Sequence, residues 1–287
     1  MKKLTTFLLL VSSLNVFSQT IVNNTSFTFS GGVYPTFSVT FNNADAGMVE
    51  KWYKTQLKSI SADMGGKKEV MSIGTRLPEI SSDTIRVFLK ADKPKKSADV
   101  YLHAAFRVNG TFVGPDSDAR QLEGCKSWMY QHAIMLKKEL VQKELETTTK
   151  QQTILENELA GLVKEKDRAQ NSIEKTQANI TEDEQEKAEV EGKSTIMVTT
   201  VDAKRQEVAN GPTEANTKEL QDLLKEQTKL TGKSEKLAKN IESGKKKIED
   251  LQYQIKKNLA DQDAKGKAID LQKKLVEEVR TKLAGMN

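Results

Sequence analysis

The C-terminal part of the chain keeps a seven-residue apolar repeat that is almost free of helix-breaking residues. Between Pro115 and Asn287 the only proline is Pro212, and Tyr253 is the only aromatic residue after Tyr130. Proline ends or kinks a helix, and a sustained heptad repeat makes helices wind around each other. The sequence therefore predicts two very long helices that form a coiled coil.

The heptad positions, called the seam positions below, continue through both predicted helices. In the first they are Leu155, Leu159, Leu162, Lys166, Ala169, Ile173, Thr176, Ile180, Asp183, Lys187, Val190, Ser194, Met197, Val201, Lys204 and Val208. In the second they are Leu220, Leu223, Gln227, Leu230, Ser234, Leu237, Ile241, Gly244, Ile248, Leu251, Ile255, Asn258, Gln262, Lys265, Ile269, Gln272, Val276, Val279 and Leu283. Asn210-Gly211-Pro212 separates the two helices, which places a turn near 210–213.

The lengths of the two helices favour a hairpin. Residues 213–285 would fold back on 137–209 as an antiparallel coiled coil, with arms of about 110 Å. Two alternatives remain open: a turn within 192–200, where Thr, Ile and Val disfavour helix, and a parallel homodimer. Polar seam residues such as Asp183 and Asn258 fix the register at a cost in stability, so we expect a flexible, fraying coiled coil.

The preceding residues predict a compact α+β head. Strand patterns occupy 25–29, 34–41, 68–73, 84–90 and 98–108, and a helix capped by Asn43 or Asp45 runs to about Ala62, before Gly65-Gly66. An antiparallel or mixed sheet with helices on one face accounts for this order. We expect the start of the first long helix to dock on the sheet through one stripe, with Trp128 beside it: Leu122, Cys125, Met129, Ala133 and Leu136.

The N-terminus has the pattern of a secretory signal peptide. Lys2 and Lys3 precede an apolar stretch from Leu4 to Phe17, and Ser18 is the expected cleavage position. We therefore predict a signal peptide at 1–18, an α+β head at 19–136 and a coiled-coil hairpin at 137–287. No stretch reaches the roughly 18 to 20 apolar residues of a membrane-spanning helix, and the expected location is periplasmic or secreted.

The charge distribution argues against nucleic acid as a partner. Residues 19–116 contain 12 Lys/Arg and 9 Asp/Glu, whereas residues 117–287 contain 31 of each, with the signs interleaved. Proteins that bind nucleic acid cluster their basic residues on one face or tail. Interleaved charges are typical of the exposed flanks of a coiled coil, where they select the partner helix.

The candidate chemical groups all have plainer interpretations. Cys125 and His132 are seven residues apart, about two helical turns and too far to touch, so Cys125 is expected to be a small buried residue. His103 is expected to be a partly exposed strand residue, and the turn at 93–96 a solvated basic loop. Gly192-Lys193-Ser194 lacks the earlier glycine and strand of a phosphate-binding loop. We predict no catalytic, cofactor or metal residues.

These observations favour an exported, non-enzymatic structural or interaction protein of the bacterial envelope. The hairpin would act as a spacer or partner-binding arm. A protein partner would bind the coiled coil or the head, and the chain could also form a homodimer. The alternatives are an adaptor-like component of a transport or secretion system and an enzyme with its site in the head. Such adaptors follow their hairpin with β-rich domains, which have no counterpart here.

The hairpin hypothesis predicts the hydrodynamic behaviour of residues 19–287. A long hairpin sediments more slowly than a globule of equal mass, because an extended molecule has a higher frictional coefficient. Analytical ultracentrifugation measures this directly. Sedimentation as a compact globule would contradict the hairpin, and a dimer that deletion of 213–287 dissolves would instead favour pairing between chains.

Overall fold

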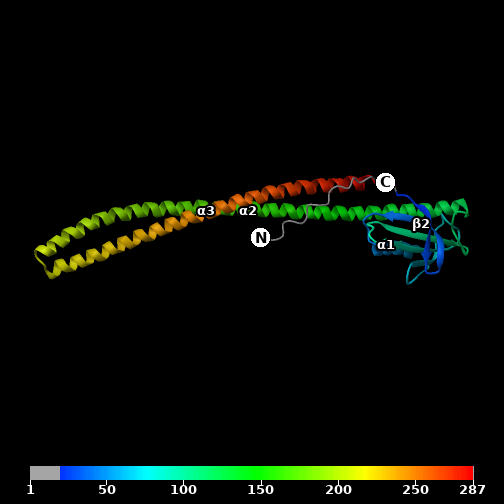
Figure 1. Ribbon diagram of the computed structural model, residues 1–287, viewed down its shortest axis with the longest axis horizontal. Helices are drawn as coiled ribbons and strands as arrows, with labels where there is room; N and C mark the ends of the chain where they lie inside the picture. Colours follow the sequence, from blue (N-terminus) through cyan, green and yellow to red (C-terminus); the bar gives the residue numbers. More distant parts are fainter. Residues whose placement is uncertain (1–19, 287) are drawn as a thin grey trace. The chain divides into compact units, whose positions relative to one another are not determined.

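The computed structural model describes residues 20–286, and the predicted signal peptide at 1–18 lies outside them. The strands are β1 (Asn23–Phe29), β2 (Gly32–Phe41), β3 (Asp63–Gly65), β4 (Val70–Thr75), β5 (Ile85–Asp92), β6 (Val100–Val108) and β7 (Thr111–Phe112). The helices are α1 (Ala46–Ile60), α2 (Ala119–Asn210) and α3 (Glu214–Ala284). The predicted fold class is confirmed: a sheet-plus-helix head followed by two long paired helices (Figure 1).

The head contains one antiparallel sheet. Its strand order is β1-β2-β6-β5-β4-β3, with β7 added beside β6. Alternation in the strands gives the sheet two different faces. One face, the covered face, packs against α1 and the start of α2 and includes Phe37, Val39, Val87, Leu89 and Phe106. The predicted helix stripe docks there, since Cys125, Trp128, Met129, Ala133 and Leu136 are all buried in the same core.

Helix α1 begins at the predicted cap but ends earlier than predicted. The Asp45 side chain accepts a hydrogen bond from the Met48 amide at 2.8 Å, as an N-cap residue should. The helix ends at Ile60 because Ser61 is extended and the Ala62 amide donates to the Ile73 carbonyl. Gly65 therefore belongs to the short strand β3, which the sequence pattern did not reveal, and the two glycines do not end the helix.

The described residues divide into two compact units, 20–149 with 275–286 and 150–274. In the second unit α2 and α3 run antiparallel beside each other (Figure 1). Every predicted seam position is buried or half-buried, including the polar ones, while most positions between them are exposed. The heptad register predicted from the sequence is confirmed in both helices.

The turn between the long helices lies at 211–213, as predicted, and the alternative at 192–200 is wrong. Residues 192–200 are helical. Thr213 and Asn216 form reciprocal bonds, because the Thr213 amide donates to Asn216 Oδ1 and the Asn216 amide donates to Thr213 Oγ1. Asn216 Nδ2 also donates to the Gly211 carbonyl at 2.9 Å. This capping arrangement satisfies donors at the start of α3 and fixes the chain reversal.

Gly244 occupies the tightest place in the seam. A Cβ atom there would lie 2.8 Å from Ile180 Cγ1 and 3.0 Å from Ile180 Cδ1, and Ile180 is only 2% exposed. The isoleucine side chain thus fills the space that the glycine leaves. Gly192 and Gly232, in contrast, face open space. Packing against Ile180 explains why position 244 is a glycine, whereas nothing in the structure requires a glycine at 192 or 232.

We expect alanine to have opposite effects at these glycines. Gly232→Ala should raise the free energy of unfolding by about 1 kcal/mol, because alanine is the better helix former. Gly244→Ala should lower it by about 1–3 kcal/mol, because the methyl group overpacks the seam. Urea unfolding followed by circular dichroism measures both changes.

The matched double variant tests the cause. Ile180→Ala makes room for the new methyl group, so its combination with Gly244→Ala should be more stable than the two single effects predict by addition. An equal gain in stability from Gly244→Ala and Gly232→Ala would contradict the packing around Gly244.

Candidate functional site

Cys125 and His132 lie in the head core but do not form a nucleophile pair. Cys125 is fully buried, and burial raises the pKa of its thiol, with the nearby Glu79 carboxylate raising it further. A thiol that stays protonated is a poor nucleophile. His132 Nδ1 instead hydrogen bonds to the Trp128 carbonyl oxygen at 2.8 Å. Because a carbonyl only accepts, this nitrogen carries the proton and donates it to that bond.

Aromatic side chains surround His132. Its ring stacks on Trp128 with centroids 4.2 Å apart, and Tyr53 packs edge-on against the same tryptophan. The Tyr53 hydroxyl is buried and has no hydrogen-bond partner in residues 20–286. Burial therefore raises the pKa of Tyr53, since the phenolate would lose its hydration. His132, Trp128 and Tyr53 therefore belong to the packed core between α1, α2 and the sheet.

His103 lies on the second face of the sheet, called the open face below. Its Nδ1 is 2.7 Å from Ser38 Oγ, and Thr25 Oγ1 is 2.6 Å from Ser38 Oγ and 2.8 Å from Thr36 Oγ1. Three hydroxyl groups and the imidazole thus form a continuous chain across β1, β2 and β6. Partial burial lowers the pKa of His103, and the charge of Asp92 partly opposes that shift.

The open face also carries a group of aromatic rings in mutual contact. Phe27 stacks on His103 at 4.1 Å, and Tyr34 stacks on Phe112 at 3.9 Å. Arg107 lies over the Phe112 ring, 5.6 Å from its centroid. The aromatic members of the group are Phe27, Phe29, Tyr34, Phe88 and Phe112.

Sequence reasoning missed the open-face group. Alternation does place Thr25 and Phe27 on one face of β1, and Ser38 on one face of β2. The pairing of Ser38 with His103 joins residues 65 positions apart and depends on the register of β2 against β6. No local pattern in the sequence fixes that register.

The other two predicted candidates lie in ordinary surroundings. Gly192, Lys193 and Ser194 are consecutive residues inside α2, where no phosphate-binding loop exists because the backbone is helical. Lys93, Lys95 and Lys96 are exposed in the turn after β5, and Lys93 Nζ donates to the Ala44 carbonyl at 3.1 Å. This turn is the exposed basic loop that the sequence indicates.

Five ion pairs join α2 to α3. Four pair a glutamate of α2 with a lysine of α3: Glu144–Lys282, Glu158–Lys265, Glu184–Lys245 and Glu186–Lys233, at 3.0, 2.7, 2.9 and 2.5 Å. In the fifth pair the lysine belongs to α2 and the glutamate to α3: Lys204–Glu219, at 2.7 Å. Exposed pairs contribute little stability singly, but each is compatible with only one alignment of the helices. The charges of these five pairs therefore act within the hairpin.

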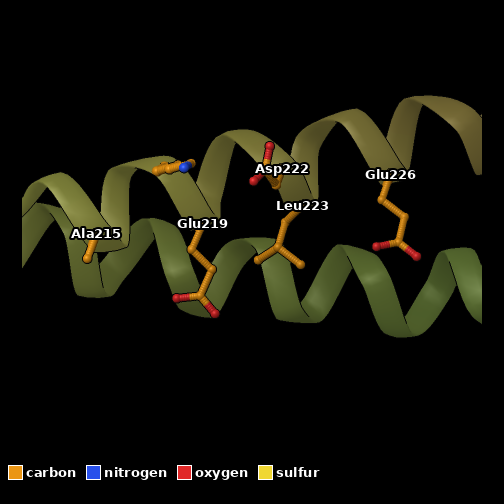
Figure 2. A pocket seen from close by; sticks show the side chains of 6 residues that line it. Ala215, Glu219, Asp222, Leu223 and Glu226 are labelled. Atoms are coloured by element: carbon orange, nitrogen blue, oxygen red, sulfur yellow. The ribbon is translucent and has the colours of Figure 1, made fainter.

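A shallow groove lies along α3 next to the turn. Figure 2 shows Glu219, Asp222 and Glu226 around Leu223, with α2 behind them. Lys204 already pairs with Glu219, and Lys225 pairs with Asp222 at 2.9 Å, so much of the acidic charge is balanced. Within residues 20–286 no group of three or more potential metal ligands is present.

Comparisons with known proteins identify no relative: no protein-family model, curated protein or solved structure matches the chain. Among the described helices, none combines the length and the apolar character that crossing a bilayer requires.

The two histidines predict a pH dependence of stability. Burial lowers the pKa of both His103 and His132 in the folded chain, so the unfolded chain binds more protons below its histidine pKa of about 6.5. The free energy of unfolding should therefore fall as the pH drops from 7.5 through 6.5 towards 5.5. Urea unfolding at several pH values measures the slope.

Replacing the histidines provides the control. His103→Gln with His132→Gln removes both titrating groups, so the slope between pH 7.5 and 5.5 should flatten even if the double variant is less stable throughout. An unchanged slope would assign the pH dependence to other groups.

Proposed function

We propose that this chain is an exported, non-enzymatic interaction or structural protein of the bacterial envelope, with the α2–α3 hairpin as its spacer or partner-binding arm. The observation that carries the proposal is the continuous seam, in which every heptad position from Leu155 to Leu283 is at least half-buried. Such a hairpin completes its own coiled coil, so it holds its outer surface in place without a second chain. Export rests on the N-terminal sequence pattern.

The use of the charges supports an arm that recognises its partner by its outer surface. Lysines that pair across the seam, such as Lys233 and Lys245, are occupied within the hairpin. The outer surface keeps large exposed side chains, including Ile196 and Tyr253, which are 69% and 72% exposed. Tyrosine is among the residues that most often anchor a protein partner, and Ile196 adds exposed apolar surface to α2.

The partner test uses the full chain in its native cells. A photo-crosslinking residue replaces Ile196 or Tyr253 on the hairpin and, as a matched head position, Lys95. We expect one defined protein to be captured from the hairpin positions, because a partner-binding arm holds its partner against α2 or α3. Capture from Lys95 alone, or capture of no protein, would contradict the role of the hairpin.

A paired deletion separates a spacer from a binding arm. Removing 160–166 from α2 and 258–264 from α3 takes one heptad from each helix, preserves the seam register and shortens the hairpin by about 10 Å. Capture at Ile196 should survive this change if the outer surface binds, and should weaken if the distance matters. Removing only 160–166 breaks the register and is the control for a disrupted seam.

A further inference from the structure

The two edges of the head sheet differ in how they are protected. At one edge, β3 has only three residues and includes Asp63, and a register shift interrupts the pairing of its neighbour β4 with β5. Short edge strands, charges and irregular pairing are the usual means by which proteins prevent another strand from adding to a sheet. That edge is closed to strand addition by these criteria.

The β1 edge has none of these protections. β1 has seven residues, contains no proline, and pairs with β2 without interruption from Asn23↔Ser38 to Phe29↔Gly32. In the described part of the chain it pairs with no other strand. No charged residue occurs anywhere from Thr20 to Ala44, although 30% of the whole chain is charged. Every second residue of β1 thus offers its backbone N–H and C=O groups outward along an uncharged edge.

A hollow of about 210 Å³ adjoins this edge. Asn24, Thr25 and Ser26 of β1 line it together with Pro35, Thr36 and Phe37 of β2. Its remaining lining is Val113, Gly114, Pro115 and Leu122. Phe37 belongs to the covered face, so the hollow opens beneath β1 on the side of α2. Its lining is uncharged and combines apolar side chains with the hydroxyl and amide groups of β1 and β2, and its volume is large enough for one branched aliphatic side chain.

We propose that the β1 edge binds an extended, uncharged peptide segment of a partner protein, which adds to the sheet as a strand and places one large aliphatic side chain in the hollow. In this mode of recognition the backbone hydrogen bonds supply affinity, and a pocket for an alternate side chain supplies specificity. The absence of charge from both edge and hollow selects a segment without charged residues, because an unpaired charge would be desolvated there. The proposal concerns the head and does not depend on the role of the hairpin.

Synthetic peptides test the proposal on the full chain. The probes are labelled seven-residue peptides of alternating Thr and Val, with either Leu or Ala at the central position, and binding is measured by fluorescence anisotropy. The Leu peptide should bind about tenfold or more tightly than the Ala peptide, because burying a leucine side chain is worth at least that factor. N-methylation of alternate amides in the Leu peptide should abolish binding, since it removes the strand hydrogen bonds.

Matched variants on β1 locate the binding. Ser26→Phe fills the hollow from the edge strand and should remove the preference for Leu over Ala. Thr28→Phe makes the same change on the same side of β1, at a residue that does not line the hollow, and should keep the preference. Circular dichroism checks that both variants fold.

Three outcomes would overturn the proposal. The first is that no peptide binds, and the second is that binding tolerates N-methylation. The third is concentration-dependent dimerisation of the chain that Ser26→Phe and Thr28→Phe both prevent, because the edge would then pair with a second copy.

Discussion

The two long helices depend on a narrow stripe of contacts with each other. Outside the seam positions, α2 and α3 expose mostly polar side chains, and most helical stability in proteins comes from packing an apolar face. The most buried apolar seam residues provide that packing: Ile180, Val190 and Val201 of α2 and Leu237, Ile269, Val276 and Val279 of α3. Beyond the start of α2, which packs on the sheet, each helix is therefore stable mainly because the other covers its stripe.

The polar seam residues set the alignment of the stripe. Lys265 lies in the seam yet bonds to Glu158 on the facing helix at 2.7 Å, and Lys204 reaches both Glu207 and Glu219. A one-heptad slip would part Lys265 from Glu158 and move Gly244 away from Ile180, where a larger residue would clash. The polar and glycine seam residues lower the stability of the hairpin, but they also favour the observed alignment of α2 and α3 over alignments shifted by one heptad.

Local patterns in the sequence predicted most of the elements, and long-range pairing accounts for what they missed. Apolar alternation located β2 through Phe37, Val39 and Phe41, and the heptads located every seam position because the period of a coiled coil is itself local. The strands β3 and β7 were missed because they have only three and two residues. The hydroxyl–imidazole chain and the hollow beside β1 were missed because both depend on which strands are neighbours.

The net charge of each long helix, counted from the sequence, favours the hairpin over a parallel homodimer. Over residues 117–287 the positive and negative charges balance, but the two helices differ. Helix α2 carries 14 Lys/Arg and 17 Asp/Glu, whereas α3 carries 17 Lys/Arg and 13 Asp/Glu. Two copies of α2 would bring acidic helices together, whereas α2 beside α3 joins a net acidic helix to a net basic one. The four ion pairs with glutamate on α2 and lysine on α3 follow this asymmetry. Counting charges helix by helix therefore favours pairing within the chain, since complementary flanks select the partner helix.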